Sequence, residues 1–178
     1  CLFSSVISYA ITQKLHVVHE HYDITGIPSS IDVVMVLKVI GLAILCAILS
    51  SLFCIFMTIV HKLFRKYFKN QYLRVFAGGL MLVLLNIVLK TTDYNGTGMN
   101  IIAKALNGDA QPAAFLLKAL FTAITIGCGF RGGEIVPSFF VGATFGCVAG
   151  GLMGMDPGFA AALGMVCFFC GVVNCPLT

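Results

Sequence analysis

Residues 127–137 read GCGFRGGEIVP, and this short stretch decides how the chain folds. It holds four glycines, an arginine, a glutamate and a proline, and an apolar run lies on each side of it, at residues 113–126 and 138–153. Because glycine and proline interrupt helices, two apolar helices are predicted to meet at a break. Unpaired backbone groups are costly in lipid, so we expect the break to be buried in protein or to line a watery cavity.

The composition of the whole chain places these helices in a membrane. Of its 178 residues, 59% are apolar and 10% are charged, whereas about 25% of the residues of a soluble domain are charged. The mean hydropathy is +1.00. These values exclude a disordered chain, a collagen and a soluble enzyme. The net charge is +4, but the basic residues lie at the ends of apolar runs, which indicates membrane topology and no nucleic acid partner.

We therefore predict an all-α polytopic membrane protein with tilted and broken helices. The longest apolar segment, residues 31–60, would form a helix of about 45 Å, longer than the roughly 30 Å of hydrocarbon, so it is expected to tilt strongly. Five Lys and Arg residues lie between residues 61 and 74, and the positive-inside rule places this basic block on the cytoplasmic side. The other predicted helices cover residues 2–11, 72–89, 99–106, 113–126, 138–153 and 159–173.

The glycine-rich break is also where the sequence predicts chemistry. The first N–H groups of a helix lack partners, and the helix dipole adds about half a positive charge there, so anions bind such ends. Gly132 and Gly133 leave the backbone accessible, and Pro137 suits the first helical turn. The candidate donors are the N–H groups of Glu134, Ile135 and Val136. A halide needs several oriented donors without a full counter-charge, since strong pairing would stop it from leaving.

The same residues resemble a known family. Residues 129–137 look like the GxFxP-type anion-binding loop of the CLC family of chloride channels and proton-coupled chloride transporters. Lys118 falls where that family often has a basic residue, and residues 174–178 are similar to its small-Pro-Leu-Thr element. The resemblance implies that the N–H groups of Glu134 and Ile135 coordinate the central anion. Lys118 is expected either to attract anions, to snorkel, or to bond to a helix end.

The resemblance predicts voltage-gated chloride channel-type anion transport and leaves the ion and the coupling open. A Gly-Gly-Glu turn resembles the fluoride-exporting branch, in which the second residue after Glu is commonly Thr; that residue is Val136 here. Fluoride export is therefore the alternative to chloride transport. The first Ser-containing anion loop, the gating-glutamate loop and the late Tyr of the family do not occur in this sequence, so a channel and an anion/proton antiporter remain alternatives.

Residues 1–178 are interpreted as an internal piece of a single transmembrane ion-transport domain, from the end of its first half through most of its second half. The expected partners are chloride or fluoride, protons in the case of an antiporter, the lipid bilayer and a second copy in a homodimer. Residues 2–11 and 24–30 are expected to face that copy. We expect an integral, multi-pass protein of the plasma membrane that needs no cofactor and is not an enzyme.

Glu134 has two interpretations. An acid at membrane depth repels an anion when it is ionised and can donate a hydrogen bond when burial keeps it protonated. In the alternative interpretation Glu134 is a loop acid that is either solvated or paired with Arg131. A functional role predicts that changing this carboxylate alters selectivity or pH dependence.

Four glycines recur at every fourth position after the break. They are Gly142, Gly146, Gly150 and Gly154. This spacing places them on one helix face, where a neighbouring helix is predicted to approach closely. A glycine surface beside the ion path is the alternative.

Histidine and cysteine could indicate other chemistry. His16, His19 and His21 lie close together in one polar connection, which we interpret as a hydrated loop, with pH sensing, a metal site or a membrane enzyme as alternatives. Most of the eight cysteines lie in apolar runs, so they are predicted to be core residues. Cys167 and Cys170 have CxxC spacing without a second pair, which gives no metal site. A cation transporter and a purely structural membrane subunit are the remaining rivals.

Overall fold

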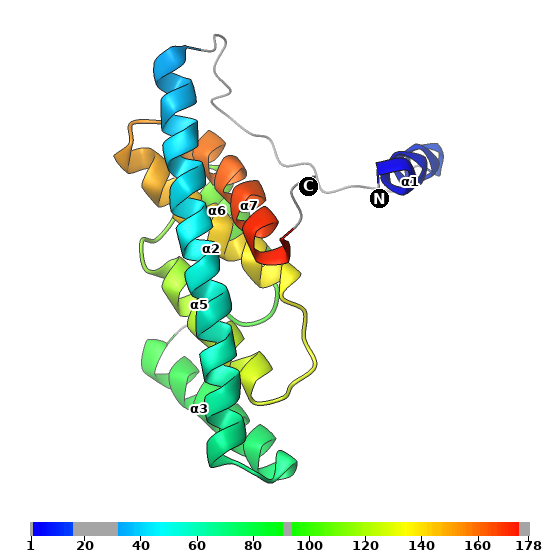
Figure 1. Ribbon diagram of the computed structural model, residues 1–178, viewed down its shortest axis with the longest axis vertical. Coiled ribbons are helices and arrows are strands. Elements are labelled where there is room, and N and C mark those ends of the chain that lie inside the picture. Colours follow the sequence, from blue (N-terminus) through cyan, green and yellow to red (C-terminus); the bar gives the residue numbers. More distant parts are fainter. Residues whose placement is uncertain (1, 16–31, 91–93, 175–178) are drawn as a thin grey trace.

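The computed structural model describes residues 2–15, 32–90 and 94–174, and these contain helices and connections but no strand (Figure 1). The helices are α1 (Leu2–Lys14), α2 (Val33–Tyr67), α3 (Gln71–Leu89), α4 (Met99–Leu106), α5 (Ala114–Gly127), α6 (Ile135–Leu152) and α7 (Pro157–Val173). The predicted all-α architecture is confirmed. The histidine cluster at residues 16–21, the segment 24–30 and residues 175–178 lie outside the described residues.

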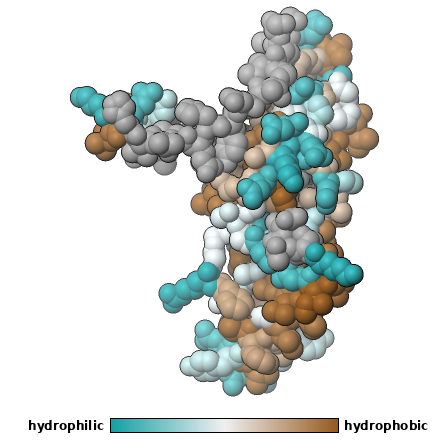
Figure 2. All heavy atoms as spheres, turned by 180° about the vertical axis from the view of Figure 1, so that it is seen from behind, coloured by the Kyte–Doolittle hydropathy of each residue, from teal (hydrophilic) through white to brown (hydrophobic). Residues whose placement is uncertain are grey.

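Three described helices, α2, α3 and α6, are long and apolar enough to cross a membrane, and α5 and α7 are shorter apolar helices. α2 has 35 residues, about 52 Å at 1.5 Å per residue, and it runs along the whole body of the molecule (Figure 1). Its outward face, including Leu37, Ile44 and Ile55, is exposed and apolar. Figure 2 shows broad hydrophobic areas on the opposite face, with hydrophilic side chains gathered across its middle. The exposed apolar face of α2 fits contact with lipid, whereas the hydrophilic middle of the opposite face does not.

α2 continues beyond its predicted end. It was expected to stop at residue 60, before the basic block, but it includes that block as far as Tyr67. Lys and Arg are good helix formers, and Arg65 and Lys66 in the last turn interact favourably with the negative end of the helix dipole. The basic block is therefore mainly the end of a helix rather than a connection.

The closest packing in the molecule joins α6 to α7. A Cβ atom added to Gly142 would lie 2.7 Å from the carbonyl oxygen of Gly164 and 2.9 Å from Cα of Met165. One added to Gly150 would collide with Cβ of Ala160. The glycines thus let the two backbones touch, and the predicted packing role of this face is confirmed. Gly154 was expected on the same face, but α6 ends at Leu152 and Gly154 lies in the turn beyond it.

Three helices end on a glycine in the left-handed region, where other residues are strained. Gly108 after α4, Gly129 after α5 and Gly154 after α6 have φ values of 87°, 97° and 66°. After α5, Gly129 N–H donates to the carbonyl of Ile126 and Phe130 N–H donates to that of Thr125, the pair of bonds of a Schellman motif. These turns fix the directions in which the chain leaves the helices.

α1 lies apart from the other helices (Figure 1). Its described apolar side chains, such as Val6, Ile7 and Ile11, are exposed. The remaining helices share a core in which α2 packs on α5 and α7, α4 packs on α6 and α7, and α3 packs on α5. The start of α6 therefore sits between α5 and the connection that leads into α4.

Candidate anion site

The glycine-rich break is shorter than the sequence predicted. Gly127 still belongs to α5, and α6 already begins at Ile135, so only residues 128–134 are outside helices. Ser138 N–H donates to the carbonyl of Glu134 at 3.0 Å, which closes the first helical turn. Pro137 is the third helical residue, as its preformed φ and missing N–H predict.

The start of α6 presents backbone donors without a side-chain cap. Glu134 is the N-cap residue, with φ −87° and ψ −13°, and its side chain makes no capping hydrogen bond. The first two helical N–H groups, those of Ile135 and Val136, have no carbonyl partner within the helix. Together with the helix dipole they form a positive end on which an anion can be bound.

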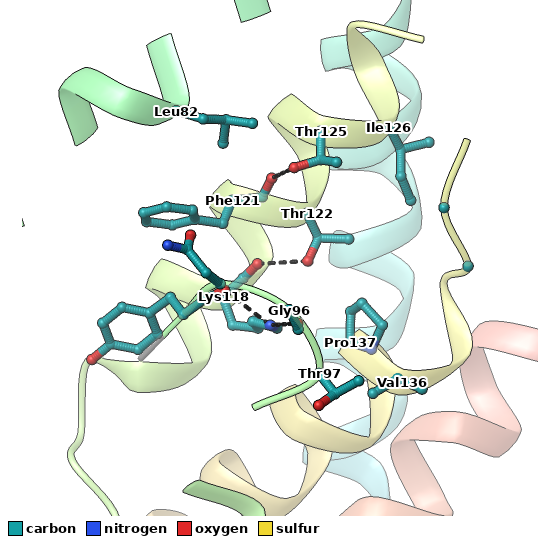
Figure 3. Close-up of a pocket in the computed structure, with 14 residues that line it drawn as sticks. Leu82, Gly96, Thr97, Lys118, Phe121, Thr122, Thr125, Ile126, Val136 and Pro137 are labelled. Carbon is teal, nitrogen blue, oxygen red and sulfur yellow. Dashed lines mark hydrogen bonds between the residues drawn. The ribbon is translucent and has the colours of Figure 1, made fainter. Parts of the chain in front are cut away.

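A pocket of about 350 Å³ lies beside this helix start. Its described lining comes from α3, the connection before α4, α5, the break and α6, and contains no acidic residue (Figure 3). The lining residues are Leu82, Tyr94, Asn95, Gly96, Thr97, Lys118, Phe121, Thr122, Thr125, Ile126, Gly132, Gly133, Val136 and Pro137. The pocket is thus lined mainly by apolar groups, and Lys118 is the one charged residue in its described lining.

Lys118 supplies the positive charge of the pocket. The residue is 2% exposed, and its Nζ donates to the carbonyls of Tyr94 at 3.0 Å and Gly96 at 2.7 Å (Figure 3). Nζ also lies 5.1 Å from the ring centroid of Phe140 in α6. The side chain neither snorkels outward nor caps a helix, which corrects two of the three expectations. Through these contacts the buried side chain of Lys118 links the connection at residues 94–98 to α5 and α6.

The structure brings most of the predicted site residues together. Five of them line one pocket: Gly132, Gly133, Val136, Pro137 and Lys118. Glu134 and Ile135 do not line it, and their side chains are exposed. A Cβ atom added to Gly132 or Gly133 would meet nothing within 4 Å. Residues 130–134 of the break are therefore exposed, and Gly132 and Gly133 among them line the pocket, whereas Cys128 at the start of the break is buried.

The loop-acid interpretation of Glu134 predicted either a solvated side chain or an ion pair with Arg131, and the exposure of Glu134 fits the first of these. Among the described residues no such pair forms, and both side chains are exposed. The carboxylate of Glu134 therefore stands without a basic partner at the positive end of α6. Nothing in the described part of the chain neutralises it except the helix dipole itself.

Comparison with known proteins identifies the family. The family model described as voltage gated chloride channel matches residues 1–178. The chain belongs to the voltage gated chloride channel family. The predicted resemblance to the CLC family is confirmed. Members of this family of channels and transporters are integral membrane proteins, and the apolar helices α2, α3 and α6 fit a multi-pass protein.

Two relatives of this voltage gated chloride channel segment are informative. It is 30% identical over 186 aligned residues to a protein of Pseudomonas syringae pv. tomato named chloride/fluoride channel protein, covering 99% of this chain and 40% of the relative. A solved structure described as a CLC-type fluoride/proton antiporter is similar with a TM-score of 0.80 and 29% identity, over 91% of this chain and 41% of that one. The chain thus spans 40% and 41% of the lengths of these relatives.

The wall of the pocket that lies opposite the break, formed by residues 94–97, was not predicted from the sequence. Residues 94–97 precede α4 and lie far from the break in sequence, and Asn95 and Gly96 indicate only a turn. A lysine inside an apolar helix was the available signal, because a buried ammonium group needs acceptors. Carbonyls of a nearby connection are such acceptors, but the sequence does not show which connection supplies them.

Replacing Lys118 with Met is expected to destabilise the full-length protein by about 2 to 4 kcal/mol, because the carbonyls of Tyr94 and Gly96 lose their buried donor. Thermal unfolding in detergent, followed by size-exclusion chromatography, measures the effect. Lys104→Met removes the same charge from an exposed site in α4 and should be near neutral. Unchanged stability of the Lys118 variant together with weaker anion binding would instead support a purely electrostatic role.

Proposed function

We propose that the protein transports a halide across the membrane and that the start of α6 binds the ion. One observation carries this proposal: two glycines of the break, Val136 and Pro137 of the first turn of α6, and Lys118 all line the same pocket. Backbone donors, a helix dipole and a fixed positive charge then act on one solute. All three favour a negative charge in the pocket.

The strength of this proposed site suits a transported ion. Lys118 shares its charge with two carbonyl groups at 3.0 and 2.7 Å, so it does not offer a free counter-ion. The N–H groups of Ile135 and Val136 are partial charges at an exposed helix end. A halide held in this way binds strongly enough to enter the site and weakly enough to leave it again, as conduction requires.

Chloride is the first candidate ion and fluoride the second. The Gly-Gly-Glu turn that contains Glu134 favours fluoride, because it resembles the turn of the fluoride-exporting branch of the family. The names of the two relatives support the same candidate, since both contain fluoride. They include a channel and a proton antiporter, so both transport modes are candidates for this protein.

Halide efflux from liposomes that contain the full-length protein tests the proposal. When a potassium ionophore carries the compensating charge, ion-selective electrodes should record chloride or fluoride leaving the liposomes faster than from protein-free controls, and without the ionophore potassium should stay inside. Flux driven by a pH gradient alone would indicate proton coupling. A protein that passes neither halide, or that passes potassium instead, would contradict the proposed function.

We further propose that residues 1–178 belong to one transmembrane domain that works as a homodimer. The single core that joins α2, α4, α5, α6 and α7 supports one domain. The exposed apolar side chains of α1, including Val6 and Ile11, support a contact with a second copy. Cross-linking through a cysteine introduced at Ile11 of the full-length protein in lipid would test this contact.

A further inference from the structure

Arg74 reaches from α3 to the end of α5. The side chain is half-buried, and its Nε donates to the carbonyl of Cys128 at 3.2 Å. In the sequence, Arg74 was grouped with the basic block at residues 61–74. Unlike the exposed Lys69, however, the side chain of Arg74 points into the protein. It therefore meets the chain at the point where α5 gives way to the glycine-rich break.

The end of α5 leaves a carbonyl group to which Arg74 can donate. In the Schellman motif the carbonyls of Thr125 and Ile126 receive the N–H groups of Phe130 and Gly129. The carbonyl of Cys128 lies beyond these two bonds, and the buried backbone there needs a donor. A guanidinium group suits this place, because a cation is favourable at the negative end of a helix dipole.

Two features of the packing make this contact specific. A Cβ atom added to Gly129 would lie 3.3 Å from Nη2 of Arg74, so the guanidinium group rests on the bare backbone of a residue with φ +97°. One turn further along α3, a Cβ atom added to Gly78 would collide with the side chain of Cys128. α3 thus holds Cys128 and Gly129 both by a hydrogen bond and by close packing.

We propose that Arg74 is a positioning residue for the anion-binding turn. It fixes the direction in which the chain leaves α5, and only residues 130–134 then separate this fixed point from the first helical N–H groups of α6. It also offsets the negative end of α5, which would otherwise oppose an anion near the break. This inference rests on the proposed function of the turn, whereas its structural part does not depend on transport.

Hydrogen–deuterium exchange in the full-length protein tests the structural part. Arg74→Met should raise the exchange rates of the amides of Cys128, Gly129 and Phe130 about tenfold, because these three N–H groups hold the hydrogen bonds that end α5 and the turn opens locally more often. Arg74→Lys should restore most of the protection. The matched control Lys69→Met removes an exposed charge from the connection before α3 and should leave these amides unchanged. Equal exchange in the Arg74→Met and Lys69→Met variants would overturn the inference, whether or not the protein transports an anion.

Transport kinetics test the part that concerns the anion. In Arg74→Met the halide concentration at half-maximal flux should rise about fivefold with a smaller change in maximal flux, and Arg74→Lys should return it toward the wild-type value. A lower maximal flux with an unchanged half-maximal concentration would show a merely structural role and overturn the proposal. If Arg74→Met does not fold, Arg74→Gln and Arg74→Lys are measured in its place. Exchange protection of the turn equal to the wild-type value in both variants would then overturn the proposal. A wild-type protein without flux contradicts the proposed function and leaves the exchange result to decide about Arg74.

Discussion

Replacing Gly146 with Ala is expected to prevent most of the protein from folding. The new Cβ atom would collide with the carbonyl oxygen of Ala160 and lie 2.9 Å from Cα of Gly164 and 3.2 Å from Cα of Ala161. These are backbone atoms of α7, so the clash cannot be relieved by rotating a side chain. Overpacking of this kind costs about 3 kcal/mol or more. Size-exclusion chromatography of the expressed protein in detergent should show little monodisperse material, and Gly146→Leu should show none.

Gly151 provides a matched control in the same helix. A Cβ atom at this position meets nothing within 4 Å, so Gly151→Ala should fold normally and gain up to about 1 kcal/mol from helix propensity. The comparison separates the close contact from any general effect of adding a methyl group to α6. If Gly146→Ala folded as well as Gly151→Ala and only reduced the ion flux, the glycine face would border the ion path instead of serving α7.

The positions of the helices were predictable because apolar runs and their breaks are local signals. The short helix at residues 99–106 has the predicted bounds, and α3 and α5 begin and end within one residue of the predicted ones. The end of α2 was not predictable by the same criterion. A basic segment is equally compatible with a helix and with a connection, and the local sequence does not distinguish them.

The roles of the basic residues inside the helices could not be predicted. Lys38, Arg74 and Lys118 each donate to backbone carbonyls, of Gly154, Cys128 and the Tyr94–Gly96 turn. In sequence, Lys38 lies 116 residues from its acceptor and Arg74 lies 54 residues from its own. Lys118 lies 24 and 22 residues from its two acceptors. Every residue has a carbonyl, so the sequence holds no signal for which one is left open. Only the assembled fold shows that the acceptors lie in connections and at glycine turns.

The candidate site was predictable in its residue types and less so in its surroundings. Gly132, Gly133 and Pro137 indicated an open backbone next to a helix start, and the structure places all three on one pocket. The exposure of Glu134 was not expected for an acid at membrane depth. Burial depends on neighbours, and this chain spans only 40% of the length of its curated relative, so the local pattern could not specify the environment of this side chain.

Replacing Glu134 with Gln is expected to raise the halide flux and to change the halide selectivity of the full-length protein. The carboxylate lies at the helix start without a capping bond, so its negative charge opposes an anion bound to the same N–H groups. The amide of Gln keeps a similar shape and a donor but carries no charge, so this repulsion is lost.

The size of the effect follows from the repulsion between two like charges near one site. Removing it should raise the halide flux on the order of tenfold, and the ratio of fluoride to chloride flux should shift because the amide can donate a hydrogen bond and the carboxylate cannot. Flux measured in liposomes from pH 5 to 8 gives both quantities. Asp109→Asn removes an exposed acid that does not line the pocket and should behave as wild type. Unchanged flux and selectivity across this range in Glu134→Gln would mean that the acid is only a solvated part of the turn, and the binding site would then consist of the backbone donors and Lys118.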